Sequence, residues 1–343
     1  MKTHSLILKL SQYALLLLVT LCTALLCICV GSVNIPAKDT LSVIWDTLSG
    51  QPVEENVSGA VIAFVRLPRV LCVALAGASL SLCGCAMQGL LRNPLADGST
   101  LGVSSGASVG AVLAIAFGIS VPGVPLAGTM AMAMLFAFLS LMIILALSYR
   151  LDASLSTNTI ILIGIVFNMF SSSVISLITS FAGDKVKDIV FWTMGSLADS
   201  SVTDVWTILG ALLIFGTVIL RYAKELNAFA IGEDNARNVG VDVKKVKLIV
   251  MIAVSALIGV CVSIGGVIGF VGLIIPHMTR MIVGPNHRRL LPATLFSGAI
   301  FLMLADLLAR IILKPLELHI GVVTSVIGSF VFIFIFYTTR KAK

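Results

Sequence analysis

Long apolar runs alternate with short polar segments along this chain of 343 residues. Most runs approach the roughly 20 apolar residues that a helix needs to cross a bilayer. Charges, prolines and turn residues separate them, so the pattern predicts an all-α, polytopic membrane protein with ten spanning helices. The expected spans are 11–31, 68–91, 99–118, 125–148, 159–182, 204–222, 247–266, 270–284, 290–312 and 321–338.

Three stretches depart from this simple pattern. The eighth span is short and is interrupted by Pro276, His277 and Arg280, so its pattern is the weakest of the ten. Residues 188–197 form a short amphipathic piece, which we expect at the membrane surface between the fifth and sixth spans. The first run follows lysines like a signal peptide, but its apolar core exceeds the usual 7–15 residues. We therefore expect an uncleaved first span.

Composition agrees with lipid as the main solvent. The chain is 58% hydrophobic and only 11% charged, whereas soluble domains carry roughly 25% charged residues. All seven cysteines fall inside apolar runs, without a CxxC pair or a histidine at metal-ligand spacing. We interpret them as small buried hydrophobic residues and expect no metal site. Residues 1–343 are predicted to form a single transmembrane domain.

The distribution of positive charge predicts the orientation. With the N-terminus inside, 16 of the 23 Lys and Arg residues fall on the inner side and 7 on the outer side. Lys and Arg concentrate on the cytoplasmic side of membrane proteins, so both termini are expected in the cytoplasm. Since location explains the net charge of +7, we expect contact with membrane lipid and no nucleic-acid partner.

A faint internal repeat relates the two halves. Because the second and seventh spans would run in opposite directions, the halves would be inverted repeats, as in many transporters. Chance similarity between glycine-rich helices is the alternative. The matching positions, all 182 residues apart, are Gly77, Gly84, Pro94 and Gly102 with Gly259, Gly266, Pro276 and Gly284.

A polar stripe follows one face of the fifth span. Asn168, Ser172, Ser176 and Ser180 recur every four residues in an otherwise apolar segment. Single serines in membrane helices usually bond back to their own helix carbonyls. A continuous stripe favours a water-filled translocation path, which is the interpretation we prefer.

The longest charged loop lies between the sixth and seventh spans. Glu233 and Asp234 suit the start of a short helix, with Arg237 four residues after Glu233 and Gly240 as its C-terminal cap. A solvated connector is one interpretation and a docking knob for a cytoplasmic partner is the other. The residues expected to make this contact are Gly232, Glu233, Asp234, Asn235, Arg237 and Asn238.

Three arginines stand on the predicted outer side, against the general bias. Asp306 and Arg310 are four residues apart, which predicts a salt bridge between them within the ninth span. Arg66, Arg69 and Arg310 together suggest an acidic partner outside the membrane.

Missing motifs narrow the possible functions. No GxxxxGK[ST] sequence is present, so ATP would have to bind to another chain. Few carboxylates lie inside spans, which argues against the alternative of an ion-coupled secondary transporter. A GxSxG sequence at 102–106 opens a membrane helix without an acid or histidine partner, which argues against a hydrolase.

Six separate motifs, in order, resemble the FecCD-type permeases, the BtuC-like subunits of ABC importers for iron-siderophore complexes, haem and cobalamin. They are RLPR (66–69), NPLAD (93–97), GEDNARNVGV (232–241), GFVGLIIPHMTR (269–280), LPATLFSGAIFLMLADLLAR (291–310) and IGVVTSVIGSF (320–330). The resemblance implies ten helices per subunit in a bacterial cytoplasmic membrane. It also implies a second permease subunit, identical or paralogous, two ATPases that bind ATP and Mg²⁺, and an external substrate-binding protein.

The resemblance also assigns roles to individual positions. It maps the coupling helices onto 226–240, and it maps the arginines that grip the binding protein onto Arg66, Arg69 and Arg310. The cytoplasmic gate is similar to Ser156, Thr157 and Asn158, although Asn158 replaces a serine of the cobalamin importer. His319 stands where the family often has proline, and the sequence does not reveal its role. The implied function is a permease, most often for a ferric siderophore, with haem and cobalamin as alternatives.

Overall fold

The computed structural model describes residues 10–31, 57–121 and 126–341, together with six positions between 40 and 49. Lys2, Lys9, Lys38 and Lys343, which entered the charge balance, lie outside the described residues.

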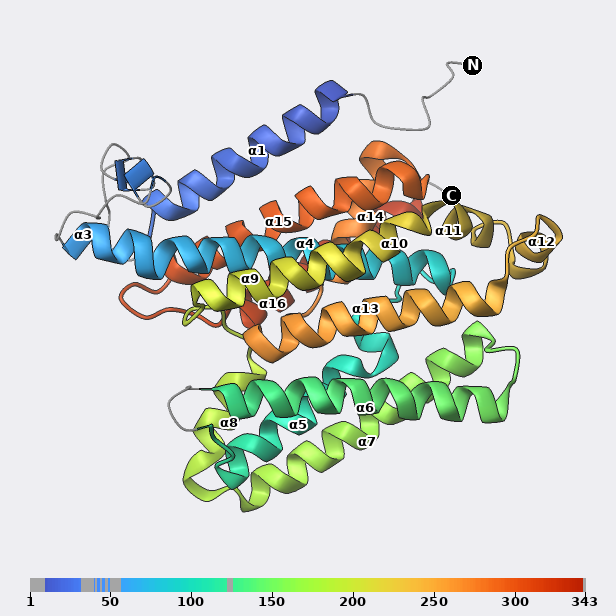
Figure 1. Ribbon diagram of the computed structural model, residues 1–343, viewed down its shortest axis with the longest axis horizontal. Helices are drawn as coiled ribbons and strands as arrows, with labels where there is room; N and C mark the ends of the chain where they lie inside the picture. Colours follow the sequence, from blue (N-terminus) through green and yellow to red (C-terminus); the bar gives the residue numbers. More distant parts are fainter. Residues whose placement is uncertain are drawn as a thin grey trace.

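Helices make up most of the described chain (Figure 1). The longer ones are α1 (Leu10–Cys29), α4 (Leu67–Leu90), α5 (Val103–Phe117), α6 (Ala127–Leu151), α7 (Thr157–Phe181), α13 (Val243–Gly265), α14 (Val271–Val283), α15 (His287–Ile311) and α16 (Ile320–Lys341). The shorter ones are α3 (Val57–Ala60), α8 (Val186–Thr193), α9 (Val202–Ala211), α10 (Thr217–Arg221), α11 (Ala223–Phe229) and α12 (Glu233–Asn238). Segments η1 (Val61–Arg66) and η4 (Leu212–Gly216) are π-helical, and η2 (Gly98–Leu101) and η3 (Gly183–Lys185) are 3₁₀ turns.

Each predicted span has a helical counterpart. Among the described residues, seven helical stretches are long and apolar enough to cross a membrane, and three shorter apolar helices accompany them. The sixth span is built from α9, η4 and α10 in continuous succession. The predicted amphipathic piece is α8, which ends at Thr193. The all-α polytopic fold is therefore confirmed.

Helix α4 forms the centre of the bundle and packs against α13, α14 and α15. Gly77 of α4 and Gly298 of α15 lie so close that a Cβ on either would collide with the other helix. Such small residues let dispersion forces hold helices together where lipid removes the hydrophobic drive. The hydroxyl of Ser81 adds a hydrogen bond of 2.7 Å to the carbonyl of Thr294.

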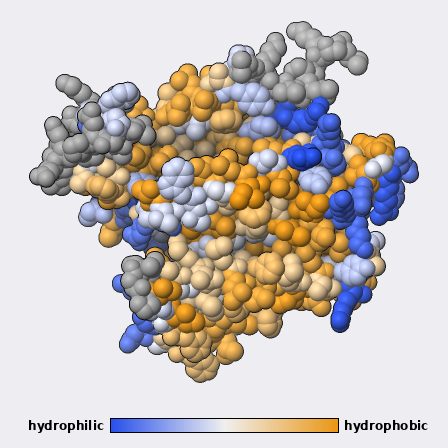
Figure 2. Space-filling model, in the orientation of Figure 1, coloured by the Kyte–Doolittle hydropathy of each residue, from blue (hydrophilic) through white to orange (hydrophobic). Residues whose placement is uncertain are grey.

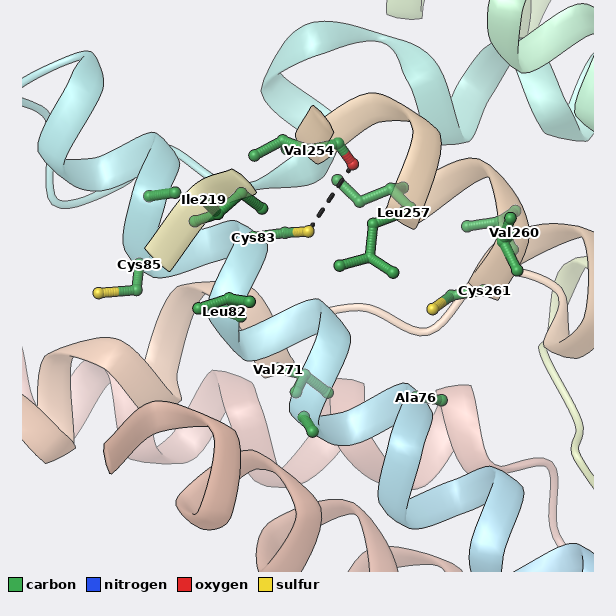
Figure 3. Packing of buried hydrophobic residues seen from close by; sticks show 14 of the residues in the cluster. Ala76, Leu82, Cys83, Cys85, Ile219, Val254, Leu257, Val260, Cys261 and Val271 are labelled. Carbon is green, nitrogen blue, oxygen red and sulfur yellow. Dashed lines mark hydrogen bonds between the residues drawn. The ribbon is translucent and has the colours of Figure 1, made fainter. Parts of the chain in front are cut away.

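The core around α4 is apolar and includes Cys83, Cys85 and Cys261 (Figure 3). Cys83 on α4 faces α13, where its thiol approaches the carbonyl of Val254 at 3.7 Å. All seven cysteines are free, and five of them are buried. They act as small apolar side chains in the packing between helices.

The short helix α14 continues past Pro276, and a side chain of α4 replaces the hydrogen bond that the proline cannot make. Proline has no N–H to donate to the carbonyl four residues earlier, which belongs to Gly272. The amide of Gln88 on α4 donates to the carbonyls of Gly272, at 3.4 Å, and Leu273, at 3.0 Å. Arg280 in turn holds the Gln88 oxygen at 3.1 Å. The interruption noticed in the sequence is therefore accommodated inside one helix.

The helix packing is unchanged when the two halves are exchanged. Helix α4 packs on α13, α14 and α15, while α13 packs on α4, α5 and α6. Similarly, α5 packs on α6 and α7, while α14 packs on α15 and α16. Figure 1 shows that α4 and α13 run in opposite directions, as do α6 and α15. This is the arrangement that an inverted repeat produces.

The residue offset inferred for that repeat needs correction. Gly102 begins α5, whereas Gly284 ends α14. Pro94 lies in the turn after α4, whereas Pro276 lies inside a helix. The offset fails because the connection from α4 to α5 is longer than the connection from α13 to α14. The halves match as sets of helices and not through one constant spacing.

The surface separates into an apolar girdle and a polar end. In the view of Figure 2, hydrophobic side chains cover the middle, and hydrophilic ones gather at the end that carries α11 and α12. The start of α1 and the end of α16 lie toward this same end (Figure 1). We refer to it below as the polar end.

Candidate coupling and translocation site

Helix α12 projects from the polar end as a small knob. Gly232 precedes it with φ 116°, and the N–H groups of Gly240 and Val241 close its other end on the carbonyls of Arg237 and Ala236. Gly240 has φ 89°, so the predicted glycine cap is confirmed as a Schellman arrangement. The side chain of Ala236 is buried. The knob is thus a rigid turn of helix seated on one small side chain.

The outward face of α12 is free to meet another molecule. Asp234, Asn235, Arg237 and Asn238 are all exposed. Arg237 pairs with Asp234 at 3.1 Å, three residues away, and not with Glu233 as the spacing suggested. The apolar side chains of Ile231 and Val239 are exposed beside these charges and amides. A surface that mixes apolar and polar side chains in this way suits a protein partner.

Helix α11 ties this knob to the rest of the bundle. Leu226 and Phe229 are fully buried. Asn227 accepts a hydrogen bond from the backbone N–H of His287 at 2.8 Å, and its amide donates to Asn286 at 2.9 Å. Since Asn286 also caps the start of α15, Asn227 links α11 directly to that helix.

Glu233 points inward and joins three elements. Its Oε1 atom lies 2.7 Å from Nζ of Lys247 on α13 and accepts a hydrogen bond of 3.1 Å from the hydroxyl of Thr157 on α7. Lys247 is fully buried and also donates to the carbonyl of Leu155 at 2.8 Å. Glu233 was predicted to touch a partner with the rest of α12, but the structure turns it toward the bundle.

The predicted gate residues lie where the turn between α6 and α7 meets the start of α7, at the polar end; we call residues 152–157 the gate turn. Leu155 adopts a left-handed conformation with φ 54°. Ser156 caps α7 by accepting a hydrogen bond from the backbone of Thr159, and Asn158 is exposed. Hydrogen bonds from Ser154 and Ser156 hold the pKa of Asp152 below its usual range. The turn is therefore held by a fixed negative charge.

The polar stripe lies on an exposed face of α7. Asn168 accepts a hydrogen bond of 2.7 Å from Ser105 on α5, and Ser172 and Ser176 are exposed. Ser180 at the end of the stripe and Ser173 beside it donate hydrogen bonds to carbonyls of their own helix. Back-bonding is thus observed at Ser173 and Ser180, and a translocation path along the stripe stays a prediction.

The outer arginines require a correction. Arg66, Arg69 and Arg310 are all more than nine-tenths buried. Arg66 donates to the carbonyl of Ile28 at 2.8 Å, and Arg310 to that of Cys27 at 3.0 Å. These carbonyls end α1, where a helix leaves acceptors unpaired and favours positive charge.

Arg69 also binds groups of this chain, in its case two carboxylates. It contacts Asp306 at 2.9 Å and Glu317 at 2.7 Å. The predicted pair of Asp306 with Arg310 is confirmed, with Oδ2 and Nε 3.0 Å apart, although the two atoms are not aligned for a hydrogen bond. In this structure the three guanidinium groups hold the chain's own helices together and do not face an external partner.

The structure also places His319, whose role the sequence left open. Its ring lies 5.0 Å from that of Phe191 on α8, at an angle of 47°. The ammonium group of Lys187 lies over the same Phe191 ring, 5.4 Å from its centre. The histidine therefore helps to fix α8 against the start of α16.

Two residues of this network escaped the sequence analysis. Lys247 was counted only as one more inner charge, although a lysine directly before an apolar run calls for a carboxylate partner. Glu317 lies in the connection before α16, and nothing in its neighbourhood indicated Arg69. Among the described residues, no group of three or more His, Cys, Asp or Glu side chains could hold a metal ion.

The chain matches known transport proteins over nearly its whole length. The FecCD transport family matches residues 16–338. The chain is similar to the uncharacterized ABC transporter permease protein YvrB of Bacillus subtilis (strain 168), with 41% identity over 88% of this chain and 86% of that protein. It is also similar to the cobalamin import system permease protein BtuC of Halobacterium salinarum, with 36% identity over 80% of this chain and 73% of that protein.

A solved structure shares the fold. It is described as an inward-facing conformation of a metal-chelate type ABC transporter. The two chains superpose with a TM-score of 0.83 and 33% sequence identity, over 94% of this chain and 97% of the other. The family match, the relatives and the all-α polytopic fold of the described residues agree. This multi-pass membrane protein belongs to the FecCD transport family of ABC importer permeases.

Proposed function

We propose that the chain imports a chelated iron compound, a ferric siderophore, across the bacterial cytoplasmic membrane. It would act with a second permease subunit, identical or paralogous, two ATPase subunits that bind ATP and Mg²⁺, and an external substrate-binding protein. The polar end would face the cytoplasm, with both termini on that side. The observation that carries the proposal is the exposed knob α12, joined through Glu233 to the first residue of α7.

The knob supports energy input from a partner. Its exposed polar residues are those predicted to contact an ATPase, and Ile231 and Val239 add exposed apolar area of 60% and 66% beside them. Helix α11 anchors the knob to the start of α15 through Asn227. A push on α12 would therefore reach both a spanning helix and the gate turn.

The stripe on α7 supports a weakly polar passage. Ser172 and Ser176 are exposed on the surface of the single chain, and polar side chains in spanning helices usually face protein or water and not lipid. A second subunit facing this stripe would enclose a path between the two chains. Such a path suits a large neutral chelate that passes without tight binding.

Two other cargoes are alternatives to a ferric siderophore. The similar proteins named above include a cobalamin permease and a metal-chelate transporter. Haem and cobalamin are therefore the alternatives, since both are bulky chelates that a generic path could also admit. An ion-coupled secondary transporter is a more distant alternative, because Asp306, a carboxylate inside a span, is already paired with two arginines.

Uptake measurements test the proposal. Cells with and without the gene would receive labelled ferric siderophore, haem or cobalamin under iron limitation. We expect loss of siderophore uptake alone, restored by the intact gene and abolished by depletion of ATP. Loss of haem or cobalamin uptake alone would support that alternative instead. Uptake that persists without ATP and collapses with the proton gradient would contradict an ATP-driven importer.

A further inference from the structure

The contacts of Glu233 with Lys247 and Thr157 connect α12 directly to the start of α7. Helix α12 packs mainly against α11 and α13. Beyond this packing, Glu233 supplies it with two polar contacts, to Lys247 at 2.7 Å and to Thr157 at 3.1 Å. Thr157 is the first residue of α7. One carboxylate oxygen thus joins α12 to the start of α7 and to α13.

Burial makes this connection stiff. The Lys247 side chain is fully buried, and that of Glu233 is 22% exposed. A buried ammonium group left without its partner is strongly destabilising, so the pair resists separation. Lysine has three N–H donors and no acceptor, and the carbonyl of Leu155 receives another of them at 2.8 Å.

The second acceptor of Lys247 belongs to the gate turn itself. Leu155 has φ 54°, a conformation that side-chain-bearing residues seldom adopt. Such a residue persists only where its surroundings hold it. The Lys247 contact holds the Leu155 carbonyl from one side, and Glu233 holds the Thr157 hydroxyl from the other.

We infer that Lys247 and Glu233 are positioning residues through which α12 sets the start of α7, so that a partner that docks on α12 moves the gate turn directly. This inference rests on the proposed function, since the partner is the ATPase. The exposed pair of Asp234 and Arg237 lies on the outward face and does not take part in this link. Docking and transmission are therefore divided between two faces of one short helix.

Thr157 allows the link to be cut with the smallest change. Thr157→Val keeps the shape of the side chain and removes only the hydroxyl, which donates a hydrogen bond to Glu233. Thr157→Ser restores that hydroxyl and serves as the rescue variant. The matched control is Thr207→Val on α9, because Thr207 is exposed and bonds only to its own helix at Thr203. Lys247→Met provides a second, more severe break of the same connection.

Hydrogen–deuterium exchange of the full chain in lipid nanodiscs gives the first comparison. In Thr157→Val, amides 159–164 at the start of α7 should exchange about tenfold faster than in the wild type, as expected for the loss of one hydrogen bond to a charged group. Amides 233–238 should be nearly unchanged, and Thr157→Ser and Thr207→Val should resemble the wild type. Equal exchange at 159–164 in Thr157→Val and the wild type would overturn the link.

Adding the ATPase subunits purified with this chain gives the second comparison. In the wild type, docking should slow exchange both at 233–238 and at 159–164. In Thr157→Val and Lys247→Met, docking should still slow exchange at 233–238 and no longer at 159–164. A local structural role alone would not remove this response to the ATPase. Slowing at 159–164 that is equal in all three chains would overturn the inference while leaving the proposed function intact. Failure of the wild type to bind the ATPase at all would instead contradict the proposed function.

Discussion

At the scale of single residues, Asp306 is the buried charge on which we expect the stability of the fold to depend most. It is almost fully buried between Arg69 and Arg310, which lie on different helices. We expect Asp306→Asn to lower the free energy of unfolding by about 3 kcal/mol or more, because it leaves buried Arg310 without its carboxylate and Arg69 with Glu317 alone. Thermal unfolding of the purified chain in detergent would measure the change.

Glu317 provides the matched control, because it contacts the same Arg69 from a more exposed position, with 33% of its side chain accessible. Glu317→Gln should cost less than about 1 kcal/mol, since solvent screens the pair. Equal losses in Asp306→Asn and Glu317→Gln would show that burial does not set the strength of this network.

The contacts of Asp306 show which residue pairs can be predicted from the sequence and which cannot. The pair of Asp306 and Arg310 followed from helical spacing and is confirmed. The contact of Asp306 with Arg69 joins residues 237 positions apart, which no local pattern reveals. For this reason the outer arginines were interpreted as a docking surface, although the end of α1 and the two carboxylates already occupy them.

At the scale of elements, Gly232 decides where the knob begins. Its φ of 116° and ψ of 149° belong to a region that essentially only glycine adopts. A Cβ at this position would meet no atom closer than 3.6 Å, so space is available. The cost of Gly232→Ala is therefore backbone strain, about 1–3 kcal/mol, confined to the start of α12. We expect faster hydrogen exchange at 233–238 and weaker ATPase association, with little change in overall unfolding.

Gly210 on α9 is the appropriate comparison for this change. It lies inside a helix with ordinary backbone angles, and a Cβ there meets nothing within 4 Å. Gly210→Ala should be neutral or stabilise the chain slightly, because glycine is unfavourable in a helix interior. The strain argument for Gly232 would be refuted if the two substitutions affected exchange at 233–238 alike.

Element-scale prediction was accurate because it depends on local chemistry. Apolar length gave the spans, and a glycine after a polar helix gave the cap at Gly240. It was less informative where a distant residue completes an element. Pro276 weakened the pattern of α14, but the amide of Gln88 that compensates for it comes from another helix. The inward turn of Glu233 likewise depends on Lys247, which is 14 positions along the chain.

At the scale of the whole molecule, the exchangeable packing of the two halves explains how a rigid bundle could have two states. Helices α4 and α13 form the shared centre, while α5–α7 and α14–α16 flank it in equivalent ways. Inverted halves of this kind can rock against each other around a fixed path. The sequence suggested the repeat, but a single constant offset could not describe connections of different length.

The exposed face of α7 is where this whole-molecule arrangement can be tested most directly. If the stripe borders water in the assembled importer, Ser176→Cys should react with a charged, membrane-impermeant thiol reagent. The reaction requires the thiolate, which forms readily only in water. Leu177 is the adjacent control, since it is 60% exposed on the apolar side of the same helix. In a Cys22→Ala background, which removes the exposed native cysteine, we expect Ser176→Cys to label at least about tenfold faster than Leu177→Cys, because the thiolate is scarce in lipid. Labelling at equal rates would mean that both faces meet the same environment, and the stripe on α7 would then not line a passage.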